Sequence, residues 1–369
     1  MDLTYEDLKY IKEDIYDEDY IKSASKKISI NIPVGVEPAV GDFISKYKYS
    51  INNSVVFNTN SKINIDNIEG SVNNIINVNR INDISNVNNF FESVNQKLVN
   101  EGVFVGCVET SKQRKKRLFK KYPAAAAYPL FLFDFVFKRI FSKIFLTKKL
   151  YYSITRGKYP IISLAETLGR LVKGGFEILG YEEIDGVTYF AAKRTRLPRY
   201  SHKPACGFLI RLKRVGKNGK LINVYKFRTM SPYSEYLQDY LYKHNHLKEG
   251  GKFNGDFRIT SWGKILRKLR VDEIPMIINF LKGDVKLVGV RPLSHQYYSL
   301  YQEDIRSRRI KYKPGLFPPF YADLPKTFSE IMDSERNYLD KYDKNPVKTD
   351  LLYFLKIFYN INFKLVLGD

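Results

Sequence analysis

Two adjacent carboxylates in the second half of the chain have the residue types and surroundings that phosphate chemistry requires. Asp272 and Glu273 follow a cluster of five cations, and a further cation, Arg291, stands directly before a proline. The five are Arg258, Lys264, Arg267, Lys268 and Arg270. Carboxylates can hold a divalent metal or attack phosphorus, and arginines bind phosphate oxygens. The stretch 256–292 is therefore the candidate site for transfer of a phosphate-containing group.

The residues after the acid pair have the pattern of a short helix. Residues 273–283 are apolar at helical spacing and end at Gly283, while Pro275 is tolerated in a first turn. Asp272 is a good N-cap for this helix, and capping alone is the alternative to a catalytic role. In the catalytic interpretation, the helix N-terminus and Arg267 keep the Asp272 carboxylate ionised and attract phosphate.

Composition narrows the class of protein and its partners. The 369 residues allow two domains with real cores. The formal net charge of +22 favours a polyanion, which means nucleic acid, anionic lipid or a phosphorylated substrate. The two cysteines, Cys107 and Cys206, indicate neither a disulfide framework nor a zinc site, so a reducing compartment is expected.

The first half has the pattern of an α/β domain. Strands are expected at 54–58, 74–78 and 103–110, with a helix over 86–102 that ends at Gly102. Residues 163–195 predict a helix, a Gly-Gly stop, and two strands joined by a turn at Asp185 and Gly186. This order resembles the C-terminal half of a Rossmann-like methyltransferase. Since no G-x-G turn lies in the first 100 residues, a degenerate scaffold or docking domain is expected.

Nothing in the sequence predicts a signal peptide or a membrane span. The N-terminus is acidic, and no apolar run reaches the roughly 20 residues that cross a bilayer. The nearest candidate, 128–146, is interrupted by Asp134, Lys138, Arg139 and Lys143. It is typical of an amphipathic helix on a membrane surface, and an ordinary helix covering the first domain is the alternative.

Four segments of the second half resemble the bacterial sugar transferases, the monotopic polyprenyl-phosphate phosphoglycosyl transferases. Their order and spacing match the family over about 207–366. The segments are 211–230, which contains YKFRTM; 256–275, which contains the acid pair; 279–294, which contains GVRP; and 311–315, which contains KPG and is followed by 334–361.

Together, this resemblance and the methyltransferase likeness of the first half imply a fold and a domain division. The chain is expected to be α/β, with a partial Rossmann-like N-terminal domain over 1–196 and a linker at 197–206. A mixed α+β, membrane-associated sugar transferase domain would then occupy 207–369.

The resemblance also implies a reaction. The family moves a sugar-1-phosphate from a nucleotide diphosphate sugar to polyprenyl phosphate through a covalent phosphosugar-aspartate. The step initiates a lipid-linked surface glycan such as exopolysaccharide, capsule or O-antigen. It would take place on the anionic surface of the bacterial inner membrane, at its cytoplasmic face.

Roles for individual residues follow from the same resemblance. Asp272 corresponds to the nucleophile, and Glu273 to a catalytic acid that holds Mg²⁺ bridging the diphosphate. The expected phosphate contacts are Arg267, Arg291, Lys226, Arg228 and Arg258. A strand would place Lys226 and Arg228 on one face. The alternatives are an exposed edge pair for Lys226 and Arg228, and a surface side chain for Arg291.

Two departures from the family leave another class of function open. The segment after KPG, 313–328, lacks the arginine with which the family contacts the nucleotide sugar, and Tyr321 or Lys326 is expected to replace it. The apolar re-entrant helix expected before residue 211 is also missing. A non-catalytic membrane scaffold for glycan enzymes is therefore the alternative. Nucleic acid is not expected as a partner, because the basic residues belong to transferase motifs.

Overall fold

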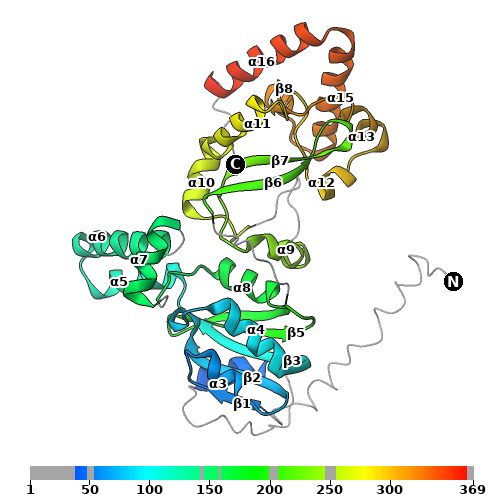
Figure 1. The fold of residues 1–369 in the computed structure, drawn as a ribbon. Coiled ribbons are helices and arrows are strands. Elements are labelled where there is room, and N and C mark those ends of the chain that lie inside the picture. Colours follow the sequence, from blue (N-terminus) through cyan, green and yellow to red (C-terminus); the bar gives the residue numbers. More distant parts are fainter. Residues whose placement is uncertain are drawn as a thin grey trace, which may run out of the picture.

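The computed structural model describes residues 38–47, 54–141, 145–156, 159–198, 207–245 and 255–363. In this part of the chain, the N-terminal half is a sheet covered by helices (Figure 1). The C-terminal half is a group of helices around two small sheets. The predicted α/β class is confirmed. Most of the predicted linker, residues 199–206, lies outside the described residues.

Five strands form the sheet of the N-terminal half, in the order β1-β2-β3-β5-β4. They are β1 (Ser54–Phe57), β2 (Val72–Arg80), β3 (Leu98–Val108), β4 (Phe176–Ile184) and β5 (Val187–Arg194). The first three strands run parallel, and β5 is antiparallel to both of its neighbours. Asp185 and Gly186, with φ of 47° and 77°, make the predicted turn between β4 and β5. The methyltransferase likeness of this domain stays a prediction.

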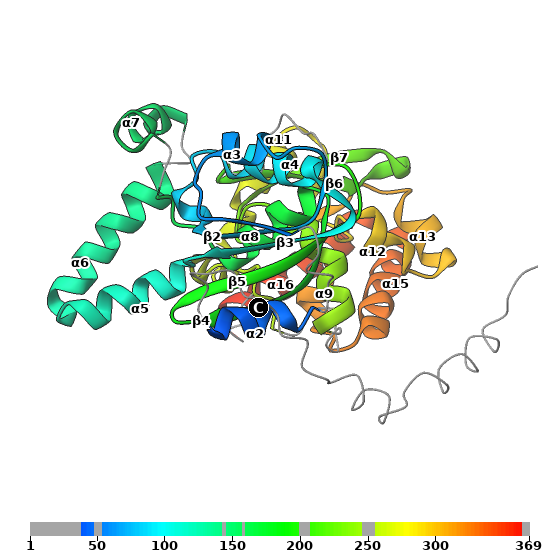
Figure 2. The ribbon, with the colours of Figure 1, turned by 90° about the horizontal axis from the view of Figure 1, so that it is seen from below.

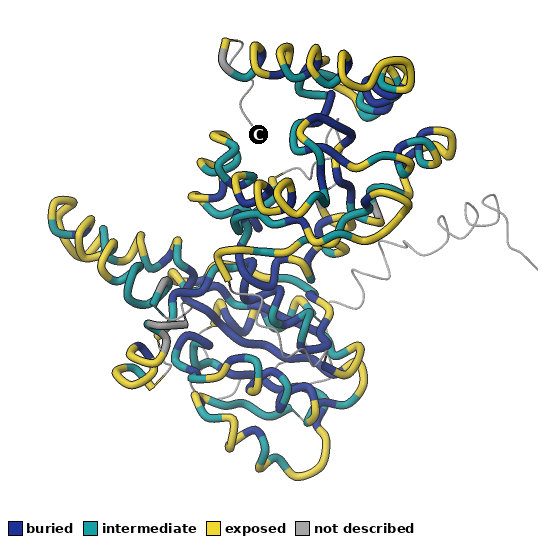
Figure 3. The backbone as a smooth tube through the Cα atoms, turned by 45° about the horizontal axis from the view of Figure 1, so that its top comes forward, coloured by how far each residue is buried: buried dark blue, intermediate teal, exposed yellow. Residues whose placement is uncertain are grey.

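Helices cover both faces of this sheet (Figure 2). One face packs against α3 (Lys62–Asp66), α4 (Val87–Lys97) and α8 (Leu164–Lys173), and the other against α2 (Pro38–Ser45). The first face is rich in phenylalanine, and the rings of Phe104 and Phe190 meet edge to face at 5.5 Å. The burial of these aromatic side chains contributes to the stability of the N-terminal half, and the central strands of its sheet are largely buried (Figure 3).

One helix is shorter than the sequence predicted. The pattern over 86–102 predicted an end at Gly102, but α4 ends at Lys97 and Leu98 begins β3. Leu98 is fully buried and pairs with β2, so extended backbone is favoured there. A Cβ atom at Gly102 would lie 2.9 Å from the backbone oxygen of Asn73, so this glycine permits the close approach of β3 to β2.

Helical segments project from the sheet as an arm, defined as residues 111–141 and 145–155 (Figures 1 and 2). It contains α5 (Ser111–Lys121), α6 (Ala124–Phe135), a stretch of π-helix (Val136–Phe141) and α7 (Phe145–Thr155). The single helix predicted over 128–146 was therefore wrong in its limits. The backbone of Pro123 is extended, so α6 begins directly after it. No helix among the described residues has the length and apolar character needed to cross a bilayer.

The C-terminal half is built around a hairpin of β6 (Leu209–Val215) and β7 (Leu221–Phe227). The turn between these strands lies at Gly216 to Gly219, where Asn218 and Gly219 adopt positive φ. A parallel pair, β8 (Lys286–Val288) and β9 (Gly315–Phe317), lies next to it. The helices that position the candidate site are α10 (Ser261–Lys268), the 3-10 turn η6 (Val271–Met276), α11 (Ile277–Leu281), α13 (Glu303–Arg309), α14 (Phe320–Asp323), α15 (Phe328–Lys344) and α16 (Pro346–Phe363).

The fully buried side chain of Asn279 joins α11 to β7. Its Oδ1 accepts from the amide of Tyr225 at 2.9 Å, and its Nδ2 donates to the carbonyl of Asn223 at 2.7 Å. The Asn279 amide thus satisfies backbone groups that a neighbouring strand would otherwise pair. It fixes the segment that carries the acid pair against the strand that carries Lys226.

A docking segment, residues 231–241, attaches the C-terminal half to the sheet domain. It contains η5 (Ser234–Leu237), whose Leu237 is fully buried in the core of the N-terminal half. The ring of Tyr233 lies 4.3 Å from the guanidinium of Arg170, and its hydroxyl accepts from the side chain of Asn88 at 2.9 Å. The two halves therefore pack together through residues that directly follow the YKFRTM motif.

Gly169 on α8 tests this docking, because a Cβ atom there would lie 2.2 Å from the backbone oxygen of Tyr233. We expect Gly169→Ala to cost about 1–3 kcal/mol in the free energy of unfolding, measured by urea denaturation. The control is Gly180→Ala, whose Cβ would meet only the hydroxyl end of the Tyr47 side chain, which can move. Equal losses in the two variants would contradict the docking role.

Asn279→Ala would remove three hydrogen bonds and leave buried backbone groups of β7 without partners. We expect a loss of about 2–4 kcal/mol in the free energy of unfolding, measured by chemical denaturation. Asn223→Ala is the control, because Asn223 contributes its backbone carbonyl to this contact and its side chain is exposed. A loss below about 0.5 kcal/mol for Asn279→Ala would show that the link is dispensable.

Candidate active site

Asp272 and Glu273 lie together in the first turn of η6. The prediction that Asp272 caps the helix is wrong, because Arg270 occupies the cap position and the helical backbone already begins at Val271. Arg270 has a left-handed backbone with φ of 57°, which costs a non-glycine residue roughly 1–2 kcal/mol. Such strain concentrates at functional sites. The predicted end of the helical segment at Gly283 is confirmed by its φ of 73°.

Glu273 forms an ion pair with Lys226 of β7. The Lys226 ammonium donates to the Glu273 carboxylate at 2.5 Å, and both side chains are mostly shielded from solvent. Burial raises the pKa of Glu273. The charge and hydrogen bond of Lys226, with the charges of Arg291 and Arg270, outweigh burial, so the pKa is lowered from its ordinary value. Glu273 is thus held as a carboxylate among cations from three segments.

Asp272 is buried, and burial raises the pKa of its carboxyl group. The positive charges of Lys226 and Arg267 oppose this shift, while the neighbouring Glu273 reinforces it. The direction is opposite to the one expected from a helix N-terminus and Arg267 alone, because burial has the larger effect. A more basic carboxylate is a better nucleophile once ionised.

Arg267 reaches the site from α10. Its Nε donates to the hydroxyl of Thr229 at 2.9 Å, and burial lowers its pKa against the charge of Asp272. Gly263 allows this approach, because a Cβ atom there would lie 1.9 Å from the carbonyl oxygen of Thr229. The α10 helix can therefore pack directly on the backbone that follows β7.

Arg270 and Tyr321 form a stacked pair beside the acid pair. The guanidinium of Arg270 lies 3.6 Å from the centre of the Tyr321 ring. Burial, followed by the charge of Glu273, raises the pKa of Tyr321 to about 12. The sequence named Arg270 only as one of the clustered cations and gave no signal for its stacking. Tyr321 was a candidate for substrate recognition, whereas the other candidate, Lys326, is exposed just before α15.

Arg291 lies in the loop after β8, and its side chain is exposed. A buried ion pair holds its backbone. Arg309 of α13 donates to the Arg291 carbonyl at 2.5 Å, and Glu335 of α15 accepts from the Arg291 amide. Arg309 and Glu335 lie 3.4 Å apart, and Glu335 is completely buried. This loop is thus fixed while the Arg291 guanidinium remains accessible.

The KPG and GVRP motifs meet at two glycines. Gly315 donates its amide to the carbonyl of Val290 at 2.9 Å, and Gly289 donates to Phe317 at 3.2 Å. A Cβ atom on Gly315 would lie 2.1 Å from the amide nitrogen of Gly289. The glycine of KPG is therefore required for close backbone packing that positions the Arg291 loop.

Two further arginines predicted as phosphate contacts, Arg258 and Arg228, make hydrogen bonds to other groups of the protein. Arg258 forms a buried, two-bonded ion pair with Asp256 at 2.7 and 2.9 Å. Arg228 lies after the end of β7, where its Nε donates to the carbonyl of Gly207 at 2.8 Å. The expectation that one strand face presents both Lys226 and Arg228 was wrong, because the strand ends at Phe227.

Arg214 of β6 is a further cation near this site that the sequence analysis did not single out. Burial, and then the charge of Arg291, lowers its pKa to about 10. The sequence pattern of β6 did not single out Arg214, because the nearby Arg211 and Lys213 are positively charged as well. The site thus contains more positive charge than its two carboxylates neutralise.

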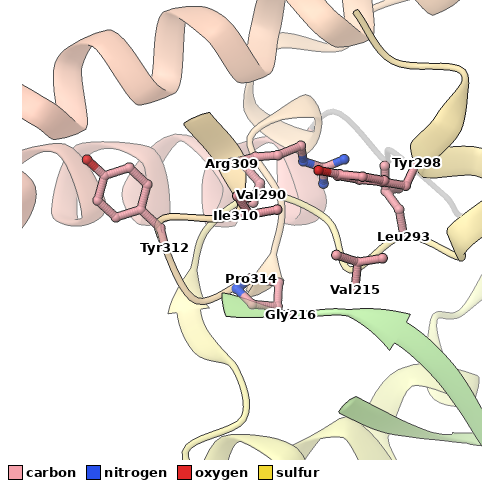
Figure 4. A pocket seen from close by; sticks show the side chains of 9 residues that line it. All are labelled: Val215, Gly216, Val290, Leu293, Tyr298, Arg309, Ile310, Tyr312 and Pro314. Atoms are coloured by element: carbon pink, nitrogen blue, oxygen red, sulfur yellow. The ribbon is translucent and has the colours of Figure 1, made fainter. Parts of the chain in front are cut away.

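A small cavity lies next to the Arg291 loop, between β6 and the residues around α13 (Figure 4). Its volume is about 10 Å³, which admits one water molecule at most. Arg309 lines it, and the Nη1 atom of Arg309 is buried without a hydrogen-bond partner. We interpret the cavity as a water site that supports Arg309, and not as a substrate pocket.

The carboxylates of the site fit a magnesium ion only together with a substrate. Among the described residues, no cluster of three or more His, Cys, Asp or Glu side chains can hold a metal. Mg²⁺ commonly binds one or two carboxylates and takes its other ligands from phosphate and water. Asp272 and Glu273 meet that requirement, so the predicted role of Glu273 as a metal ligand stays a prediction.

The buried pair behind Arg291 yields a stability prediction. We expect Arg309→Met to cost about 3–5 kcal/mol in the free energy of unfolding, because it leaves the Glu335 charge buried without its partner. The double variant Arg309→Met/Glu335→Leu should recover most of that loss. Chemical denaturation measures both, and a double variant as unstable as the single one would contradict this explanation.

Comparisons with known proteins concern the same part of the chain. Residues 200–366 match the family model described as bacterial sugar transferase. Galactosyl transferase CpsE of Streptococcus agalactiae is 41% identical over 104 residues, which cover 28% of this chain and 23% of that protein. The uncharacterized sugar transferase EpsL of Bacillus subtilis is 39% identical over 103 residues, covering 28% and 45%.

A third relative is the undecaprenyl-phosphate galactose phosphotransferase of Salmonella typhimurium. It is 36% identical over 108 residues, covering 28% of this chain and 22% of that protein. The chain spans less than half the length of these relatives. A solved structure, a possible exported protein from Bordetella parapertussis, covers 36% of this chain and 42% of its own at 13% identity, with a TM-score of 0.22 that supports no inference.

The matched residues contain the acid pair, the cations around it and the two motifs that meet at Gly289 and Gly315. Both the resemblance of the motifs and the family match therefore concern the residues that form the candidate site. Residues 200–366 of this chain, which contain the candidate site, are thus similar to the bacterial sugar transferase family.

Proposed function

We propose that the C-terminal half transfers a sugar-1-phosphate from a nucleotide diphosphate sugar to polyprenyl phosphate, initiating a lipid-linked surface glycan. The observation that carries the proposal is a pair of shielded carboxylates among Lys226, Arg267 and Arg291. The printed name of one relative, an undecaprenyl-phosphate galactose phosphotransferase, supports the same class of acceptor and reaction.

In the proposed reaction, Asp272 is the nucleophile. Its carboxylate attacks the phosphorus that bears the sugar, the bond from that phosphorus to the bridging oxygen breaks, and nucleoside monophosphate leaves. A phosphate oxygen of the lipid then attacks the same phosphorus and releases the Asp272 carboxylate. Two displacements replace one difficult transfer. The raised pKa of Asp272 supports this role, because it indicates a basic carboxylate.

The surrounding cations would bind the diphosphate. Arg267 belongs to α10, which precedes the acid pair in the sequence, and Arg291 belongs to the loop after β8, which follows it. Arginine suits phosphate oxygens because its guanidinium offers two parallel donors. Mg²⁺ held by Glu273 would neutralise charge on the diphosphate. Lys226 then keeps Glu273 ionised for that role.

The stacked Arg270 and Tyr321 are our candidates for recognising the base or sugar of the donor. The family arginine that normally follows KPG is missing, and Tyr321 lies in the segment where it would be expected. An aromatic ring backed by a guanidinium offers a flat surface on which a planar or sugar ring can stack. Substrate recognition in this chain would then depend on stacking in place of that arginine.

An exposed apolar surface beside the acid pair supports a lipid acceptor. Leu269 is 61% exposed, Ile277 49% and Leu281 78%, and Trp262 on α10 is 65% exposed. Contiguous exposed apolar residues mark a site of membrane or partner contact. We propose that this surface faces the cytoplasmic leaflet of the inner membrane, where the nucleotide donor and the lipid acceptor can meet.

A non-catalytic scaffold remains the second candidate, and the missing arginine after KPG is the observation that favours it. The two candidates differ in donor binding. Calorimetry with a panel of nucleotide diphosphate sugars, with and without Mg²⁺, separates them. Binding that requires Mg²⁺ supports the enzyme, and a complete absence of binding supports the scaffold.

Asp272→Asn is the direct test of the nucleophile. We expect transfer to fall at least about a thousandfold, because an amide cannot form the acyl-phosphate, while the thermal unfolding midpoint stays near wild type. Release of nucleoside monophosphate with polyprenyl phosphate in detergent measures the rate. Asp340→Asn, which alters an exposed acid of α15, is the matched control and should retain full activity. Activity surviving in Asp272→Asn would refute the assignment.

A further inference from the structure

The arm of the N-terminal half exposes apolar surface that a free helix would normally bury. Tyr128 is 61% exposed, Leu130 43%, Leu132 62% and Phe133 71%. These residues are nearly consecutive, so they point to several sides of α6. A helix that is apolar all round is normally buried in a core or in lipid. Figure 2 shows α5 and α6 extending away from the sheet, which leaves both helices accessible.

The same arm has a strong positive charge. Its residues, 111–141 and 145–155, contain eleven Lys and Arg and a single acid, Asp134. Arg114 and Lys138 neutralise that acid, at 2.5 and 2.8 Å from its carboxylate. Exposed cations of α5 include Lys112, Lys116 and Lys120. The arm therefore carries excess positive charge at its surface, directly beside apolar side chains.

Packing within the arm holds its charged and apolar helices together. The Lys115 ammonium lies between 5.4 and 5.7 Å from the centres of the rings of Phe119, Tyr128 and Phe131. The rings of Phe119 and Tyr128 meet edge to face at 5.0 Å. The lysines of α5 and the apolar residues of α6 thus form one surface.

The chemistry of this surface fits anionic lipid better than other polyanions. Nucleic acid would pair with the lysines but would leave Leu132 and Phe133 in water. A bilayer surface offers phosphates to the lysines and the boundary of the acyl chains to the apolar residues. Aromatic side chains also concentrate at that boundary.

We propose that the arm lies on an anionic bilayer surface, with α6 at the boundary between headgroups and acyl chains and the α5 lysines on lipid phosphates. This contact would bring the chain to a membrane-bound acceptor. Only that role rests on the proposed function, and the binding of the arm to lipid does not. In Figure 1 the arm and α10 both lie toward the left of the view.

Vesicle flotation of the full chain tests the proposal. The probes are vesicles of phosphatidylcholine alone and vesicles of phosphatidylcholine with phosphatidylglycerol. The wild type should bind the anionic vesicles much more strongly. The triple variant Lys112→Glu/Lys116→Glu/Lys120→Glu should weaken that binding about a hundredfold, given the contribution of each lysine near an anionic surface.

The matched control changes the same charge elsewhere. Lys217, Lys220 and Lys311 are exposed, lie at the hairpin turn and after α13, and would be replaced by glutamate together. This control should weaken binding several-fold at most. Equal weakening by both triple variants, or none by the arm variant, would overturn the proposal. A wild type that binds neither vesicle would overturn it too and would favour an acidic protein as the partner.

A second readout reports the depth of α6 directly. Trp262 is the single tryptophan of the chain, so Phe133→Trp in a Trp262→Phe background places one fluorophore on the arm. Its emission should shift to shorter wavelength when anionic vesicles are added, and an unchanged emission would overturn the proposed contact.

Transfer in detergent should be unaffected in the triple variant Lys112→Glu/Lys116→Glu/Lys120→Glu. A wild type that binds vesicles but transfers no sugar phosphate would refute the proposed function and leave the arm proposal standing.

Discussion

Two adjacent carboxylates can be buried in this protein only because cations from separate segments surround them. Burial raises the pKa of the Asp272 and Glu273 carboxyl groups, and their mutual repulsion acts in the same direction. Lys226 from β7 and the arginines around the acid pair oppose both effects. They outweigh burial at Glu273, which lies 2.5 Å from Lys226, and only reduce its effect at Asp272, whose pKa stays raised. The rest of the C-terminal half can be understood as the means of bringing these charges together.

The positioning depends on buried polar contacts more than on a large core. Asn279 fixes the acid-bearing turn to β7, and the buried pair of Arg309 and Glu335 fixes the backbone of Arg291. Glycines allow the close approaches: Gly263 for α10, and Gly315 for the KPG segment. A site with charges on four segments needs such fixed contacts, because small displacements weaken phosphate binding and in-line attack. The docking of residues 231–241 extends this support into the N-terminal half.

Local patterns predicted the features that depend on neighbouring residues. The acid pair, the turn at Asp185 and Gly186 and the end of the helical segment at Gly283 were all visible in the sequence. The left-handed Arg270 was not, because no residue type demands that conformation there.

Features that depend on contacts between distant segments were also hidden. Pairing with β2 ended α4 early, and packing of Tyr233 on α8 joined the two halves. The buried ion pair of Arg258 with Asp256 was not anticipated, and the role of Arg258 as a phosphate contact stays a prediction.

The most direct test of the central claim is intact-mass analysis after incubation with nucleotide diphosphate sugars and Mg²⁺, without lipid acceptor. The account predicts a gain of one sugar phosphate that maps to Asp272, disappears when polyprenyl phosphate is added and is missing from Asp272→Asn. An adduct that maps to another residue, or that forms in Asp272→Asn, would contradict it.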